Sequence, residues 1–249
     1  MFKKKNIIVT GSNGLIGKKL KKYFTNEGAN FFGIDIKGDK ETLKCDVTNE
    51  NQVSKTINLI AKKNQPDILI NNAAINPGNV IELKKKGFKF SNYNTELWKK
   101  TLDVDLIGSY LMSKYCCKYF EKKNLGTIIN ISSIYGMVGP DQEIYSTKKK
   151  FTGYKPLEYS VSKAGLIGFS KALASFYKGT NIKVICLILG GISNKQSKKF
   201  IKNYKKKTIS ERLASVDEIV DYISFFASNK SSYSSGTCIN IDGGALSIL

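Results

Sequence analysis

The sequence predicts an α/β fold in which a doubly wound parallel sheet carries helices on both faces. Short apolar, strand-like runs alternate with longer helix-like segments along the whole chain. These runs are continuously apolar, as expected for a parallel sheet that is buried on both faces. No break in composition divides the 249 residues, and this length suits one domain of the larger α/β kind. In such a sheet, ligands bind at the carboxyl ends of the strands.

The elements follow one another as repeated strand–helix units. We expect strands at residues 5–10, 30–36, 67–71, 126–131, 182–189 and 237–241. Helices are expected between them, at about 15–27, 49–64, 95–122, 156–177 and 216–228. The first apolar run ends in a glycine-rich turn rather than in a small-residue cleavage site, so it is interpreted as a strand and not as a signal peptide. The lysine-rich stretch 195–207 is too short for a second domain and is expected to be mobile.

Composition excludes several classes of protein. No run approaches 18 consecutive apolar residues, so no transmembrane helix and no membrane association are expected. The five cysteines are scattered without metal-ligand spacing, so no metal site is predicted. Their odd number, without a secretion signal, favours reduced thiols and a cytoplasmic location.

The formal net charge of +20 comes almost wholly from lysine, since Arg212 is the only arginine. Sites that read nucleic acid favour the planar fork of arginine, and these lysines form no stripe interleaved with aromatic residues. We therefore expect no nucleic-acid partner and interpret the charge as compositional drift. Steering of an anionic substrate by this charge stays open.

A glycine-rich turn follows the first strand and opens a helix. Glycines allow close approach to a pyrophosphate, and the start of the helix supplies N–H groups and a positive dipole end. The alternative is a purely structural turn. The cofactor-binding residues predicted here are Gly11, Asn13, Gly14, Leu15, Ile16 and Gly17.

Two carboxylates follow at positions that suit the adenosine half of a dinucleotide. Asp35 ends the second strand, where it can accept hydrogen bonds from ribose hydroxyls and repel a 2′-phosphate. NAD is therefore the expected cofactor, and Lys37 close by keeps NADP possible. Asp46, followed by Val47, is predicted to contact the adenine, or else to cap the next helix.

Small residues and amides follow the strand at 67–71. Asn72, Ala73 and Ala74 suit backbone contact with a cofactor ribose, although in isolation they would read as an ordinary turn.

Tyr159 and Lys163 are spaced so that a helix places both side chains on one face, about one turn apart. A phenol ionises at about pH 10, and a nearby ammonium favours its ionised form. The strand that begins at Gly126 ends in Ser132 and Ser133, and one of these hydroxyls can donate to a substrate carbonyl oxygen.

Together these segments resemble the short-chain dehydrogenase/reductase family over essentially the whole chain, with the Asp242-Gly243-Gly244 run near the end of the chain in the expected order. The resemblance implies a single Rossmann domain over residues 1–249, with about seven strands, that transfers a hydride between NAD and its substrate. It implies that Tyr159 is the general acid/base and that Lys163 bonds the nicotinamide ribose. Ser133 would hold the substrate oxygen, and the turn at Gly190 would present Ile192 to the nicotinamide carboxamide.

The chain departs from the family pattern at several positions. Gly11, Gly14 and Gly17 have the spacing of the longer, sugar-nucleotide-modifying members. Asp105 stands where the family has a catalytic Asn that holds a water in a proton relay, and it is predicted to be catalytic with altered charge. Gly190 follows Leu189 instead of the usual proline, which leaves that loop less rigid. A mobile substrate loop is expected at about 190–212.

The interval between Ser133 and Tyr159 is about twice that usual in the family. We interpret the extra residues, at about 137–156, as a substrate-loop insertion, with a solvated loop as the alternative. The stretch from Tyr135 to Lys163 resembles flagellin-modification and sialic-acid-like sugar biosynthesis oxidoreductases. Lys148, Lys149 and Lys150 within it could attract a phosphate or simply face solvent.

The leading hypothesis is an NAD-dependent enzyme that interconverts an alcohol and a ketone on a small, carbohydrate-like substrate. The first alternative is a reductase of 3-oxoacyl or other small carbonyl compounds. The second is a dinucleotide-binding sensor or scaffold without turnover. The resemblance also implies a homodimer or homotetramer.

Overall fold

The computed structural model describes residues 1–75, 85, 87–145 and 153–248. Within these residues, seven parallel strands form one sheet in the order β3-β2-β1-β4-β5-β6-β7. The strands are β1 (Asn6–Thr10), β2 (Asn30–Asp35), β3 (Thr42–Lys44), β4 (Ile68–Asn71), β5 (Gly126–Ser133), β6 (Ile182–Leu189) and β7 (Cys238–Ile241). Successive strands are added on one side of β1 up to β3 and on its other side from β4 onward, so the strand order reverses between β1 and β4. This is the switch point where ligands bind in such sheets.

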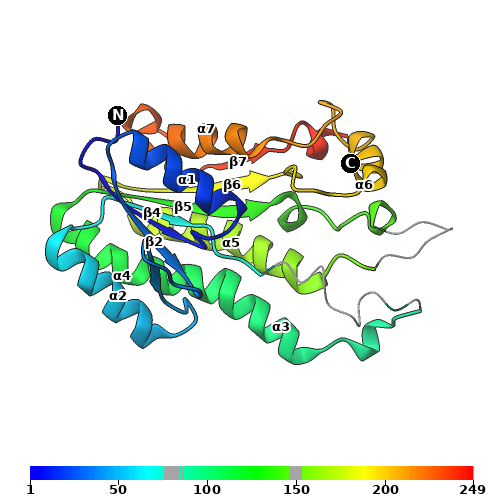
Figure 1. Cartoon of the computed structure of the whole chain (residues 1–249), viewed down its shortest axis with the longest axis horizontal. Helices are drawn as coiled ribbons and strands as arrows, with labels where there is room; N and C mark the ends of the chain where they lie inside the picture. The colour runs from blue at the N-terminus through cyan, green and yellow to red at the C-terminus, as the bar shows by residue number, and fades with distance from the viewer. Residues whose placement is uncertain (76–84, 86, 146–152, 249) are drawn as a thin grey trace.

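Helices cover both faces of the sheet (Figure 1). On one face α1 (Leu15–Asn26) packs beside α7 (Val216–Ala227). The opposite face carries α2 (Glu50–Lys63), α4 (Gly108–Lys123) and α5 (Leu157–Phe176). The predicted doubly wound α/β fold is therefore confirmed.

The core consists of two apolar layers, one on each side of the sheet. Ile7 and Val9 of β1 face α1 and α7, whereas Ile8 between them faces α2 and α4. All three side chains are fully buried, because both faces of a parallel sheet must be covered. This rigid sheet sets the positions of the loops at its carboxyl edge.

Two features of this part of the fold differ from the expectation. The short edge strand β3 was not expected, since its three residues carry no apolar pattern and depend on pairing with β2. The helix expected at 95–122 is present, but a π-helical segment lies within it. It consists of α3 (Thr95–Leu102), a π-helical segment (Asp103–Ile107) and then α4. Such a widened turn in a helix often accompanies a functional residue.

The stretch expected to be a mobile loop at about 190–212 contains a helix, α6 (Lys198–Lys205). The Ser197 side chain caps it by accepting a hydrogen bond from the backbone N–H of Phe200. Tyr204 packs with Ile144 and Leu213 in a small apolar cluster, and this tertiary contact stabilises the helix. The sequence did not predict the helix because its many lysines leave few apolar residues to form a pattern.

Across the described part of the chain, we find no helix with the length and hydropathy needed to span a bilayer. All five cysteines are free thiols. Among the same residues, no three His, Cys, Asp or Glu side chains gather as a metal-ligand set.

Candidate active site

The glycine turn packs against the residues that follow β4. Gly11 has a φ of +64°, and a Cβ atom there would lie 2.9 Å from the Cα atom of Ala73. A Cβ atom at Gly17 would lie 2.4 Å from the carbonyl oxygen of Gly11, so the helix can approach the turn only at a glycine. The Asn72 side chain donates to the carbonyl oxygens of Thr10 and Gly11. The structure thus joins two predicted cofactor segments into one backbone cradle.

The rest of the turn lies as expected for a phosphate-binding loop. α1 begins at Leu15, directly after Gly14, so its first N–H groups point into the turn. Ile16 packs on the core beneath.

Asp35 lies at the carboxyl end of β2 and fixes the glycine turn. Its carboxylate accepts one hydrogen bond from the backbone N–H of Asn13 at 3.0 Å and another from that of Lys37 at 3.1 Å. The Asn13 side chain in turn donates to the carbonyl oxygen of Lys37. These bonds fix the carboxylate at the carboxyl edge of the sheet, where it lines a cavity beside the glycine turn.

A cavity of about 500 Å³ opens beside the glycine turn. Its lining includes Gly11, Asp35, Asp46, Val47, Ala73 and Ala74. The fold brings these residues together from the ends of four strands, and all of them were predicted to bind the cofactor. The cavity, the glycine cradle and the carboxylate at its rim fit that group.

The alternative reading of Asp46 as a helix cap is wrong. Asn49 caps α2 by accepting a hydrogen bond from the N–H of Gln52. Asp46 instead closes a turn by accepting hydrogen bonds from the backbone N–H and the hydroxyl of Thr48.

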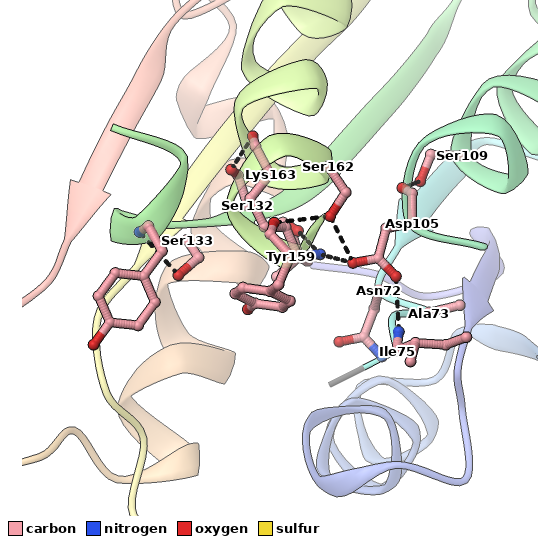
Figure 2. A network of polar contacts seen from close by, with 12 residues as sticks. Asn72, Ala73, Ile75, Asp105, Ser109, Ser132, Ser133, Tyr159, Ser162 and Lys163 are labelled. Carbon is pink, nitrogen blue, oxygen red and sulfur yellow. Dashed lines mark hydrogen bonds and ion pairs between the residues drawn. The ribbon is translucent and has the colours of Figure 1, made fainter. Parts of the chain in front are cut away.

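Tyr159 and Lys163 lie on α5 next to the end of β5 (Figure 2). The Lys163 ammonium lies 5.5 Å from the centroid of the Tyr159 ring and donates a hydrogen bond to the carbonyl oxygen of Ile131 at 3.1 Å. Lys163 is only 3% exposed, so the sheet and helix hold its charge at one place. The Lys163 ammonium thus lies on the same helix face as the Tyr159 ring, and the catalytic role of the pair stays a prediction.

The two serines at the end of β5 have different roles in the structure. Ser132 is buried and donates its hydroxyl to the carbonyl oxygen of Lys163 at 2.8 Å, which ties β5 to α5. The Ser133 hydroxyl accepts a hydrogen bond from the N–H of Tyr135 at 3.3 Å, so its own proton can still be donated. Ser133 is the serine that stays suited to holding a substrate oxygen.

Asp105 projects from the π-helical segment toward Lys163 (Figure 2). One carboxylate oxygen lies 3.5 Å from the Lys163 ammonium and accepts a hydrogen bond from Ser162 at 3.1 Å. The other oxygen accepts a hydrogen bond from the backbone N–H of Ile75 at 2.7 Å. Asp105 therefore links the residues after β4 to the helix that carries the phenol.

The sequence did not single out Ser162, Ile75 or the polar residues behind Asp105. Asn71 donates to the Asn130 side chain at 2.8 Å, and Asn130 donates to Ser170 at 2.8 Å. This buried chain of amides joins β4, β5 and α5. Asn130 is a polar residue between Ile129 and Ile131 in a buried strand, and this position is the one signal in the sequence that could have predicted the hydrogen-bonded chain.

The insertion at about 137–156 is described only in part, and Lys148, Lys149 and Lys150 lie outside the described residues. Its first part packs against the α6 region: the Asp141 carboxylate lies 3.0 Å from the Lys207 ammonium, and the Tyr145 and Phe200 rings lie 5.6 Å apart. Tyr145 and Tyr135 share a hydroxyl hydrogen bond of 2.8 Å. Tyr145 of the insertion thus lies beside Tyr135 and Phe200, and these three rings form what we call the aromatic wall.

Gly190 and Ile192 follow β6 on the same edge of the sheet. The Gly190 N–H donates to the carbonyl oxygen of Ile241, and Gly191 donates to the Tyr204 hydroxyl. Ile192 pairs with Ala214 and packs on the core. Gly190 also lines a separate cavity of about 250 Å³ on the side of β7. No contact places either residue at the nicotinamide, so their predicted role stays a prediction.

Known proteins show the same architecture. A family model described as enoyl-(acyl carrier protein) reductase matches residues 16–245. The chain is 29% identical to the 3-oxoacyl-[acyl-carrier-protein] reductase of Buchnera aphidicola subsp. Baizongia pistaciae, over 97% of each chain. It is 30% identical to the post-translational flagellin modification protein A of Campylobacter coli, over 98% of this chain and 99% of that protein.

A short-chain dehydrogenase from Leptospira borgpetersenii, solved with bound NAD⁺, superimposes with a TM-score of 0.86 at 30% identity, covering 98% of this chain and 93% of that one. Its fold, the matching family model and the sequence similarity agree over nearly the whole length. The chain belongs to the short-chain dehydrogenase/reductase family of NAD(P)-dependent oxidoreductases.

Proposed function

We propose that this protein uses NAD to interconvert an alcohol and a ketone on a carbohydrate-like substrate. The observation that carries the proposal is the position of three residues: Ser133 lies at the end of β5, and Tyr159 and Lys163 lie on the adjoining helix α5. A cavity that suits the adenosine half of NAD opens at the carboxyl edge of the same sheet. The solved Leptospira relative that contains NAD⁺ supports the choice of cofactor.

In the proposed mechanism, NAD supplies the hydride acceptor when it is bound. The Ser133 hydroxyl donates a hydrogen bond to the substrate oxygen and holds it against Tyr159. The Tyr159 phenolate takes the hydroxyl proton as the ketone forms, and it returns that proton in the reverse direction. The Lys163 ammonium favours the phenolate electrostatically, because Lys163 is only 3% exposed and its charge is weakly screened by solvent. Asp105 holds Lys163 in place through their ion pair.

The aromatic wall favours a sugar over a short acyl chain. Tyr135, Tyr145 and Phe200 lie next to one another, with hydroxyl groups among flat apolar rings. Rings of this kind stack on the apolar faces of sugars, while hydroxyl groups bond their polar edges. The similarity to the Campylobacter coli flagellin modification protein A points the same way.

A second candidate is the reduction of a 3-oxoacyl compound. The similarity to the Buchnera 3-oxoacyl-[acyl-carrier-protein] reductase favours it, at almost the same identity and coverage. A non-catalytic, dinucleotide-binding scaffold is the third candidate, and it requires that Tyr159 perform no chemistry.

One screen separates these candidates. Purified protein is incubated with sugar nucleotides, amino-sugar phosphates, free sugars and an acetoacetyl thioester, and NADH absorbance is followed. We expect turnover of a sugar-type compound, and we expect Tyr159→Phe to abolish it while NADH binding stays nearly intact. The control is Tyr233→Phe, which alters a fully exposed phenol and should leave turnover unchanged. Turnover of the thioester alone would support the second candidate, and wild-type turnover in Tyr159→Phe would contradict the mechanism.

A further inference from the structure

Two of the five free thiols lie side by side in the sheet. Cys186 of β6 is paired in register with Cys238 of β7, and the backbone N–H of Cys186 donates to the carbonyl oxygen of Thr237 at 3.0 Å. Neighbouring strands of a sheet lie about 4.8 Å apart. A disulfide needs a Cα separation of roughly 4.4 to 6.8 Å. The backbone therefore already brings this pair into range.

Both side chains lie on the face of the sheet that α5 covers. Cys186 belongs to an apolar cluster with Ile167 of α5, and Cys238 packs against the same cluster. The next residue of each strand, Leu187 and Ile239, packs in the cluster on the opposite face. Burial raises the pKa of the Cys186 thiol to about 12, and the Cys238 thiol adds to this rise. The two thiols are therefore near neighbours and not merely paired through their backbones.

The two thiols differ in their access to solvent. Cys186 is fully buried, whereas Cys238 is half-buried on β7, which is the last strand in the order of the described sheet. The remaining cysteines, Cys45, Cys116 and Cys117, are buried in the cluster beneath α2 and α4. Of the five cysteines, Cys238 is therefore the one that a dissolved oxidant reaches, and Cys186 is the thiol beside it.

We propose that Cys186 and Cys238 form a reversible disulfide when the protein meets a disulfide oxidant of low molecular weight. This inference goes beyond the proposed oxidoreductase function and does not depend on it. The bond requires the two Cβ atoms to approach to about 3.8 Å, closer than the spacing of the strands, so it forms under strain. Strained disulfides are readily reduced, and this makes the modification reversible.

The reaction takes two exchange steps. The Cys238 thiolate attacks one sulfur of oxidised glutathione, whose S–S bond breaks and releases one glutathione thiolate. The Cys186 sulfur then attacks the Cys238 sulfur and displaces the second glutathione. Over both steps the protein loses two protons and two electrons. One oxidised glutathione becomes two reduced molecules, which carry the two protons away.

The alternative is that the pair only packs, since a free cysteine behaves as a small apolar residue in a core. A packing pair leaves Cys238 free or modified by glutathione alone, whereas a disulfide site passes the bond on to Cys186. Tyr145 and Tyr159 pack against the same cluster. The disulfide would therefore form within the cluster that supports the proposed catalytic phenol.

The test treats the purified, reduced protein with oxidised glutathione and then counts free thiols by mass spectrometry of the intact chain. In wild type the count should fall from five to three per chain, because one disulfide consumes two thiols. Tryptic digestion without reductant should yield peptide 184–195 joined to peptide 231–249, since trypsin cleaves after Lys183, Lys195 and Lys230. Dithiothreitol should restore all five thiols.

Two variants separate the two steps. Cys186→Ala should stop after the first step, so glutathione stays on Cys238. Cys238→Ser should keep all of its remaining thiols free, because the accessible one is absent. The matched control is Cys117→Ala, which removes another buried thiol and should still yield the joined peptides.

A wild-type protein that ends with glutathione on Cys238, or with all five thiols free, would overturn the inference. A disulfide between two chains or through another pair of cysteines would overturn it as well. The wild-type measurement does not require any variant to fold. Since it follows thiols and not turnover, its outcome is also distinct from that of the substrate screen.

Discussion

The carboxylate of Asp105 and the ammonium of Lys163 form an ion pair of 3.5 Å whose two side chains are 0% and 4% exposed. A buried pair is stable only where further hydrogen bonds satisfy both charges. Here Ile75 and Ser162 donate to the carboxylate, and Lys163 donates to Ile131. The family resemblance implies a neutral asparagine at the position of Asp105, so we predict that this site contains one negative charge more than the family pattern.

We predict that Asp105→Asn shifts the pH profile of turnover. The negative charge of Asp105 offsets part of the field by which Lys163 favours the Tyr159 phenolate, and the amide removes that charge while its oxygen can still accept the Ile75 N–H. The rising limb of log kcat against pH should move to lower pH by about one unit. Asp217→Asn, which alters an exposed carboxylate paired with Lys19, serves as the control and should leave the profile in place. An unchanged profile in Asp105→Asn would show that this charge does not act on the phenol.

We predict that NADH binds more tightly than NADPH and that Asp35→Asn reduces the difference. The Asp35 carboxylate at the cavity rim repels a 2′-phosphate, whereas an amide oxygen can still accept the hydrogen bond from the Asn13 N–H. The ratio of the two dissociation constants, measured by fluorescence titration, should move toward NADPH by roughly tenfold, or about 1.4 kcal/mol. Asp39→Asn changes an exposed carboxylate in the connection between β2 and β3 and should not alter the ratio. Equal affinities in the wild type would refute the role of Asp35.

We predict that Phe200→Ala weakens substrate binding without affecting the cofactor. The Phe200 ring contacts Tyr145 at 5.6 Å and stacks on Tyr204 at 5.8 Å, so it joins α6 to the insertion. Its loss should loosen the aromatic wall and raise KM by roughly tenfold, with the NADH dissociation constant unchanged. Lys202→Ala, on the exposed side of the same helix, tests whether any change in α6 has this effect. A rise in the NADH dissociation constant equal to that in KM would mean that Phe200 supports the whole fold instead.

We predict that the protein forms a homodimer or homotetramer through α4 and α5. Tyr110 of α4 and Val161 of α5 are 44% and 45% exposed, and the Tyr110 ring adjoins that of Phe169 at 6.3 Å. Exposed apolar side chains that adjoin on neighbouring helices favour an interface. Tyr110→Asp should lower the mass measured by light scattering to that of a monomer, and Leu59→Asp, which alters an exposed leucine on α2, should not. A monomeric wild type would contradict the prediction.

Local pattern and spacing were enough to predict much of this protein. The continuous apolar runs predicted the buried parallel strands, because a sheet covered on both faces needs apolar residues at every position. The spacing of Tyr159 and Lys163 predicted their shared helix face, because an α-helix repeats every 3.6 residues. The glycines at 11, 14 and 17 predicted the turn, and at Gly11 and Gly17 a Cβ atom would come within 2.9 Å and 2.4 Å of backbone atoms.

Tertiary contacts decided the rest. β3 exists because β2 offers it a pairing edge, and α6 exists because Tyr204 and Phe200 have an apolar partner surface in the insertion. Which serine stays available was settled by the bond between the Ser132 hydroxyl and the carbonyl oxygen of Lys163. None of these partners is a neighbour in sequence.

The chemistry of the site divides in the same way. The sequence by itself determined the family, the sheet and the shared helix face of Tyr159 and Lys163, since each depends on residues within one element or on a repeated order of elements. Only the tertiary structure brought Asp105 to Lys163. The energy of two charges depends on their separation and on the water between them, and a fold sets both by packing segments that are distant along the chain.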